Sequence, residues 1–112
     1  MSCLSSNYRI KTTKEFEKVY KTSKKWHTNS FILFFQEDSV LKNGFVASKK
    51  VGNAVKRNSA KRRLKALFLE YCDTIKIGKY ILVAKDTITQ KEYLELKKDF
   101  LFAFRKMKLL DE

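Results

Sequence analysis

A run of basic residues is the part of this sequence with the clearest chemical potential. Between Val40 and Leu69 there is no Asp or Glu, and the same stretch contains nine Lys and Arg residues. Cations gathered without neighbouring carboxylates attract polyanions, and the net charge of the whole chain is +13. The composition therefore favours a nucleic acid or an anionic surface as partner over charge that serves only solubility.

The basic residues also have a helical spacing, because residues from about Asn58 to Tyr71 are predicted to form a helix. At about 100° per residue, one arc of this helix is apolar and should face the core: Ala60, Leu64, Leu67, Phe68 and Tyr71. A second arc carries Asn58, Lys61, Arg62 and Lys65, with Arg57 on the border and Arg63 on the other flank. Like charges one turn apart repel each other in a helix, so a face without carboxylates indicates a binding surface.

Catalytic side chains do not form a recognisable set. A protein nuclease would usually gather carboxylates around metal ions or use a histidine acid and base, whereas this chain has one histidine, His27. Cys3 and Cys72 are far apart in the sequence and give no zinc pattern, so we expect them to be reduced thiols. We predict no catalytic and no metal-ligating residue in the protein itself.

Aromatic residues in the first third of the chain are a second candidate surface. Thr12 to Glu15 reads as a capping box that opens a helix to about Thr22 or Ser23, with Phe16 and Tyr20 one turn apart. The aromatic and β-branched segment from Trp26 to Gln36 predicts a strand that carries Phe34. Rings beside lysines suit single-stranded nucleic acid, although core packing is the commoner fate of such rings. We favour a cleft for Tyr20, whose hydroxyl prefers a wet edge, and leave cleft and core open for Phe16 and Phe34.

The remaining segments complete a single domain over residues 1–112. The pattern predicts two further strands, Gly44 to Ser48 and Tyr80 to Lys85. It also predicts a capping box at Thr89 to Glu92, which begins a helix to about Lys108. This order predicts an α/β fold of the α+β sandwich type, with one sheet and helices packed on it. The first residues lack a signal-peptide core and no apolar run could span a bilayer, so we expect a cytoplasmic protein without a membrane partner.

The segment from Ser48 to Lys65, SKKVGNAVKRNSAKRRLK, resembles the signature of the bacterial ribonuclease P protein subunit. The resemblance extends to Arg9-Ile10 and to four further segments: Glu15 to Tyr20, Phe31 to Phe34, Tyr80 to Lys85 and Phe102 to Lys106. Three positions depart from the family pattern, since Ser59 and Lys65 stand where the family has Arg and Phe34 where it usually has Tyr. Lys56 and Arg63 are the candidates to replace the cation missing at Ser59.

The resemblance implies both a fold and a function. It implies the order α-β-β-β-α-β-α with a left-handed crossover near the signature helix. It implies the protein component of an endoribonuclease whose RNA subunit carries the chemistry, with Mg²⁺ held mainly by that RNA and the substrate. The partners would be the ribonuclease P RNA subunit and precursor tRNA, whose 5′ leader is removed. The RNA-binding residues would be Lys49, Lys50, Lys56, Arg57, Asn58, Lys61, Arg62 and Lys65, and the leader cleft would contain Phe16, Tyr20 and Phe34.

Three other classes of protein share part of this pattern. A ribosomal or other structural RNA-binding protein would have the charge but not the ordered signature. A helix-turn-helix DNA-binding module would need two adjacent helices, whereas strands are predicted on both sides of the basic helix. A membrane-surface protein would need exposed apolar residues beside the basic face.

Overall fold

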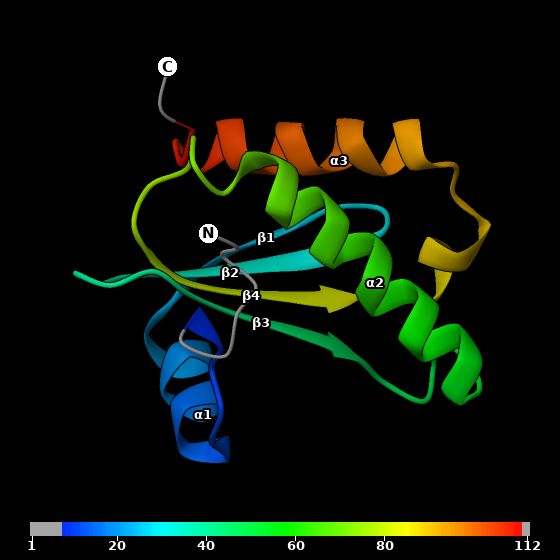
Figure 1. Ribbon diagram of the computed structural model, residues 1–112, viewed down its shortest axis with the longest axis horizontal. Coiled ribbons are helices and arrows are strands. Elements are labelled where there is room, and N and C mark those ends of the chain that lie inside the picture. The colour runs from blue at the N-terminus through cyan, green and yellow to red at the C-terminus, as the bar shows by residue number, and fades with distance from the viewer. Residues whose placement is uncertain (1–7, 111–112) are drawn as a thin grey trace.

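One four-stranded sheet with helices on both faces organises the protein, as a computed structural model of residues 8–110 shows (Figure 1). The elements follow the order α-β-β-β-α-β-α, with one 3-10 helix before the last α-helix, which confirms the expected fold class. Their bounds are α1 (Thr13–Thr22), β1 (Lys24–His27), β2 (Phe31–Glu37), β3 (Lys42–Ala47), α2 (Ala54–Tyr71), β4 (Gly78–Ala84), η2 (Asp86–Gln90) and α3 (Tyr93–Lys106).

The sheet has the strand order β1-β2-β4-β3, so its two edges are β1 and β3. β2 is antiparallel to both of its neighbours, whereas β3 and β4 are parallel and therefore need a crossover connection, which α2 provides. In Figure 1 both parallel strands run to the right with β4 above β3, and α2 returns from right to left in front of them. This path is left-handed, as the resemblance implied, although such crossovers are right-handed in nearly all proteins.

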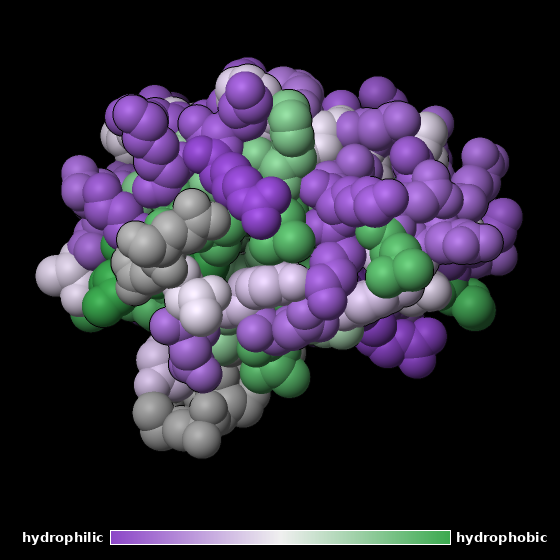
Figure 2. Space-filling view, turned by 90° about the horizontal axis from the view of Figure 1, so that it is seen from above, coloured by the Kyte–Doolittle hydropathy of each residue, from purple (hydrophilic) through white to green (hydrophobic). Residues whose placement is uncertain are grey.

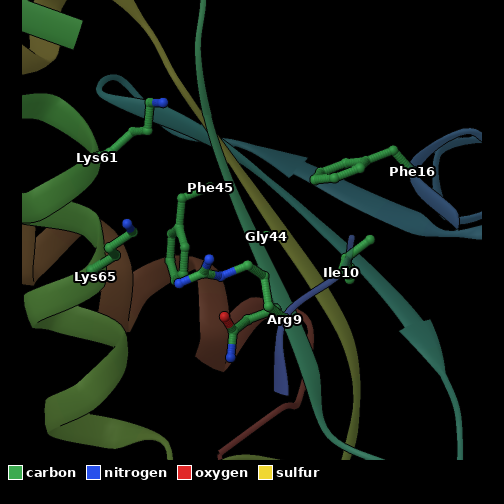
Figure 3. A pocket seen from close by; sticks show the side chains of 8 residues that line it. Arg9, Ile10, Phe16, Gly44, Phe45, Lys61 and Lys65 are labelled. Atoms are coloured by element: carbon green, nitrogen blue, oxygen red, sulfur yellow. The ribbon is translucent and has the colours of Figure 1, made fainter. Parts of the chain in front are cut away.

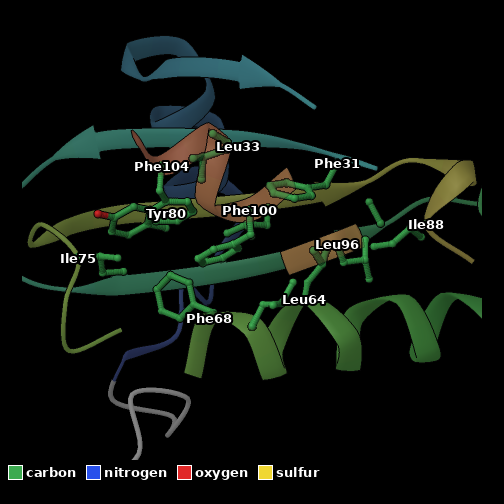
Figure 4. Packing of buried hydrophobic residues seen from close by; sticks show 14 of the residues in the cluster. Phe31, Leu33, Leu64, Phe68, Ile75, Tyr80, Ile88, Leu96, Phe100 and Phe104 are labelled. Atoms are coloured by element: carbon green, nitrogen blue, oxygen red, sulfur yellow. The ribbon is translucent and has the colours of Figure 1, made fainter. Parts of the chain in front are cut away.

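The main core lies between the sheet and the helices α2 and α3 (Figure 4). Alternate residues of β2 point into it, because successive strand residues face opposite sides of a sheet. Phe100 and Phe104 of α3 stack with ring centroids 4.2 Å apart, and Phe104 also stacks on the fully buried Tyr80. The Tyr80 hydroxyl donates a hydrogen bond of 2.6 Å to the carbonyl of Lys76, so burial leaves no polar atom of this side chain unpaired.

A smaller core holds α1 on the opposite face of the sheet. Val19 of α1 and Ile81 of β4 are fully buried there, together with Ile10. α1 begins as predicted, because the Thr12 hydroxyl accepts a hydrogen bond of 3.1 Å from the Glu15 amide. The Glu15 carboxylate accepts a 3.3 Å bond from Lys42 of β3, so an ion pair also fixes α1 to the sheet edge.

α2 starts four residues earlier than the sequence indicated. The Asn53 side chain accepts a hydrogen bond of 3.0 Å from the Lys56 amide and caps the helix, which then begins at Ala54 rather than near Asn58. Gly52 precedes this cap with a φ of +144°, a conformation that residues with a Cβ rarely adopt. The apolar arc is confirmed: Ala60, Leu64, Leu67 and Phe68 are buried and Tyr71 is half-buried.

Two other expected boundaries were wrong. Thr89 lies in η2, and α3 is capped by Glu92, which forms the reciprocal capping box with Glu95. The segment expected as one strand, Trp26 to Gln36, is a hairpin, because the Thr28 hydroxyl accepts hydrogen bonds from the amides of Ser30 and Phe31 and turns the chain. In both cases a side chain bonds the backbone locally and competes with the regular element.

Cys72 is disulfide-bonded, so the expectation of reduced thiols is wrong for this residue. Cys3 lies outside the described residues. No helix within residues 8–110 is both long and apolar enough to cross a membrane.

Candidate nucleic-acid interface

The signature segment presents seven cations without internal counter-charges. Lys49 and Lys50 are exposed in the turn after β3, and the others project from α2. Within the described part of the chain none of the seven forms an ion pair. Because they repel one another and no carboxylate balances them, this surface is poised to bind an anion. The set comprises Lys49, Lys50, Lys56, Arg57, Lys61, Arg62 and Lys65, with Asn58 exposed among them.

The other two cations of the basic run have structural roles. Lys42 pairs with Glu15, and Arg63 donates to the carbonyls of Ile88 and Lys91 from the opposite flank of α2. Arg63 therefore anchors η2 to α2 and is not available to replace the cation missing at Ser59. Of the two expected replacements, only Lys56 remains exposed.

A hollow of about 300 Å³ separates α2 from the edge strand β3 (Figure 3). Lys61 and Lys65 extend into it from α2, and Arg9 reaches it from the segment before α1. That segment is held beside β3 by a hydrogen bond of 2.9 Å from the Ile10 amide to the Asn43 carbonyl. Among residues 8–110 no carboxylate lines the hollow, so three cations from two distant segments meet around one space.

Arg9 was missing from the predicted site residues. In the sequence, the one signal for Arg9 was its membership of the Arg9-Ile10 segment of the family resemblance. Its position opposite Lys61 and Lys65 depends on a bridge to β3, which no local pattern specifies. A second hollow of about 440 Å³ follows the exposed side of α2, between Val55 and Lys65. Lys61 and Lys65 line both hollows, so they lie at the centre of the cationic surface.

The start of α2 adds to the positive potential. Its first turn contains no acidic residue, and helix N-termini carry a partial positive charge from their free amides. The Nε atom of Arg57 is buried there and has no hydrogen-bond partner within the described residues. Anions approaching this end of the helix therefore meet side-chain cations and the positive end of the helix dipole.

The three predicted cleft aromatics lie together on the other face of the sheet, against α1. Tyr20 meets Phe34 edge to face with ring centroids 4.8 Å apart, and Phe16 lies 6.3 Å from Tyr20. Tyr20 is 38% exposed, whereas Phe16 and Phe34 are half-buried against the smaller core. Each of these two rings therefore packs on the smaller core and keeps part of its surface accessible.

Close packing sets the positions of these rings. The Phe16 ring lies directly over Gly44, where an added Cβ would be only 2.8 Å from it. Partial burial raises the pKa of the Tyr20 phenol, so this hydroxyl stays protonated and can donate a hydrogen bond at neutral pH. The surface thus offers ring edges and one neutral donor beside exposed lysines of α1.

Clustered metal ligands are not found in the same surface. Within residues 8–110 no three His, Cys, Asp or Glu side chains gather closely enough to hold a metal ion. The side chains that line the hollows beside α2 are cations, amides and apolar groups, which suit phosphate rather than a metal.

The fold and this surface define a small α+β protein with the surface chemistry of a nucleic-acid-binding protein. The chain belongs to the ribonuclease P protein family, because the family model for ribonuclease P matches residues 4–108. It is 42% identical over 99 residues to the ribonuclease P protein component of Nitratiruptor sp., covering 88% of this chain and 91% of that protein. It is 34% identical over 107 residues to the component of a Geobacillus species, covering 92% of each chain.

Solved structures share the fold. The ribonuclease P protein of Staphylococcus aureus superposes with a TM-score of 0.84 at 24% identity, covering 92% of this chain and 97% of that one. The protein from Thermotoga maritima superposes with a TM-score of 0.75 at 19% identity, covering 84% and 92%. The expected family is confirmed by the family model and the sequence relatives, and the expected fold by these structures.

Proposed function

We propose that this ribonuclease P protein component binds the RNA subunit through α2 and the preceding turn, and binds the 5′ leader of precursor tRNA beside α1. The observation that carries the proposal is a set of seven cations on one surface, none of which forms an ion pair within residues 8–110, in a protein with a net charge of +13. The relatives named above are ribonuclease P protein components, which supports an RNA partner.

The cationic surface suits a structured RNA because it contacts phosphates without reading bases. The hollow between α2 and β3 is large enough for a backbone phosphate, and Arg9, Lys61 and Lys65 surround it. Arg9 binds as a planar fork, whereas the two lysines act as mobile point charges. This arrangement supports the proposed binding of the RNA subunit and adds Arg9 to the residues that would bind it.

The aromatic surface suits a single strand because stacking needs exposed rings beside positive charge. Tyr20 supplies the most exposed of the three rings, and Lys14, Lys18 and Lys21 of α1 are exposed around it. A duplex keeps its bases stacked internally, so such rings favour an unpaired leader over mature tRNA.

The hydrolysis itself belongs to the RNA subunit in this proposal. Mg²⁺ would be held mainly by that RNA and by the substrate, since phosphate oxygens are the ligands that Mg²⁺ prefers. The protein residues would orient the leader and neutralise the phosphates of the two RNAs near each other. Purified protein should therefore leave precursor tRNA intact with Mg²⁺, and adding the RNA subunit should restore leader removal. Cleavage by protein that persists after removal of contaminating nucleases would contradict this division of roles.

Two neighbouring arginines of α2 provide a matched test of the RNA-subunit surface. Arg62 is exposed and unpaired, whereas Arg63 is bonded to two carbonyls on the other flank. Arg62→Ala should weaken binding to the RNA subunit and lower the log-log salt slope by roughly 0.7 to 0.9, the value for one phosphate contact. Arg63→Ala should leave that slope unchanged and lower the melting temperature instead. Equal slopes in wild type and Arg62→Ala would place the RNA elsewhere.

A further inference from the structure

An aromatic pair lies partly exposed at the β1 edge of the sheet, outside both surfaces described above. Trp26 of β1 is half-buried, and Phe102 of α3 is 52% exposed although it is a large apolar side chain. Their ring centroids are 6.3 Å apart, and the Lys106 ammonium lies 5.4 Å from the centre of the Phe102 ring. Figure 2, seen from the α3 side, shows a largely hydrophilic surface that is interrupted by hydrophobic patches.

Exposed lysines flank both rings along the chain. Lys25, Lys98 and Lys106 are exposed, and within the described part of the chain none of them forms an ion pair. Asp99, three residues before Phe102, accepts a hydrogen bond of 2.8 Å from the Ser30 hydroxyl. Half-exposed rings beside unpaired cations are what single-stranded nucleic acids bind, because every base has a face that stacks and every nucleotide a phosphate.

The strand register connects this pair to the leader surface. Phe34 of β2 lies directly opposite Lys25 of β1, and Trp26 is the next residue along that strand. Successive strand residues point to opposite faces, so Lys25 lies on the α1 side of the sheet and Trp26 on the α3 side. In the described part of the chain β1 is an edge strand, with β2 as its one neighbour. A chain that leaves Phe34 therefore crosses one strand, passes Lys25 and reaches Trp26 around the edge.

We propose that Trp26 and Phe102 form a second stacking site, which binds leader nucleotides that continue past the Tyr20 and Phe34 surface. This inference rests on the proposed leader binding and extends it to the distal part of the leader. A second copy of the protein is the competing occupant, and the net charge of +13 opposes it because two such molecules repel each other.

Phe102→Ala in the reconstituted holoenzyme tests the proposal with two precursor tRNAs. One leader is just long enough to fill the surface beside α1, and the other is several times longer. We expect about fivefold weaker binding of the long-leader substrate, which corresponds to one stacked base at the lower end of the usual range, and no change for the short one. Leu94→Ala is the matched control, because Leu94 is 68% exposed on the same helix and lies outside the pair.

Two substitutions separate stacking from simple apolar contact. Phe102→Tyr should keep the long-leader affinity because the ring remains, whereas Phe102→Leu should lose it. Unchanged long-leader binding in Phe102→Ala, an equal loss with both leaders, or rescue by Phe102→Leu would each overturn the proposal. Failure of the underlying leader surface is distinguished by Tyr20→Ala, which should weaken binding of the short-leader substrate as well. Sedimentation of wild type and Phe102→Ala tests whether a second copy of the protein covers the pair instead. A dimer that only the wild type forms would also overturn the proposal.

Discussion

Replacing Tyr20 by alanine removes the most exposed ring of the proposed leader surface and leaves the cationic surface on α2 intact. Stacking of a base on an aromatic side chain is worth roughly 1 to 3 kcal/mol by alanine substitution. Tyr20 is 38% exposed and its ring already meets Phe34 at 4.8 Å, so only part of the ring is available to a base. We therefore expect the lower part of that range, about 1 to 1.4 kcal/mol, or about five- to tenfold weaker binding.

The same substitution should have a moderate effect on folding. Loss of the aromatic contact with Phe34 removes about 0.5 to 1.5 kcal/mol from the free energy of unfolding, and loss of the buried part of the ring removes roughly 1 kcal/mol more. In a domain of this size 1 kcal/mol corresponds to a shift of roughly 4 °C in melting temperature, so the variant should remain folded at the assay temperature. Tyr20→Phe should behave like wild type in both respects, because it keeps the ring and loses only the hydroxyl.

The assay is equilibrium binding of precursor tRNA and of mature tRNA to the reconstituted holoenzyme. The affinity loss in Tyr20→Ala should appear only with the precursor and should disappear when the leader is removed. If the variant weakens both RNAs equally and its melting temperature falls by much more than about 10 °C, then Tyr20 is a packing residue. The assignment of a leader surface beside α1 would then be refuted, whereas the assignment of α2 would be unaffected.

Two further substitutions test features that position these surfaces. In Gly44→Ala the new methyl group would be 2.8 Å from the Phe16 ring, so the ring must move away. We expect a changed affinity for the 5′ leader with little loss of folding stability. Unchanged leader binding would exclude the Phe16 ring from the leader surface. A hydrogen bond from Lys97 at 2.8 Å lowers the pKa of Glu70 below its ordinary value of 4.5. The stability from this carboxylate is therefore present above the unfolded-state pKa and is lost as the pH falls through the lowered one. Melting curves between neutral and acidic pH should show a smaller decrease for Glu70→Gln than for wild type, and identical decreases would contradict the pairing.

The fold could be predicted from the sequence wherever the pattern of apolar residues was regular. The apolar arc of α2 is buried as expected because helical periodicity alone places Leu64, Leu67 and Phe68 on one side. Boundaries were less predictable where polar side chains competed for the backbone. Asn53 extended α2 backwards, and the Thr28 hydroxyl divided one expected strand into a hairpin.

The sequence predicted which types of residue form the candidate site, but only partly which of them share one surface. The absence of carboxylates between Val40 and Leu69 and the signature of the family are properties of the chain itself. They were sufficient to indicate a cationic helix and an RNA partner. Periodicity also placed Arg62 and Arg63 on different flanks of the apolar arc, but it did not reveal what Arg63 contacts.

The tertiary structure decided which of these residues are available. Arg63 meets two carbonyls because η2 packs on that flank of α2, whereas Arg62 is exposed. Arg9 lines one hollow with Lys61 and Lys65, and Trp26 meets Phe102, only because the sheet brings residues more than fifty positions apart close together. A local pattern specifies which side of a helix or strand a residue occupies, because that depends on the repeat of the element alone. What lies opposite that side depends on how distant elements pack, and no local repeat contains that information.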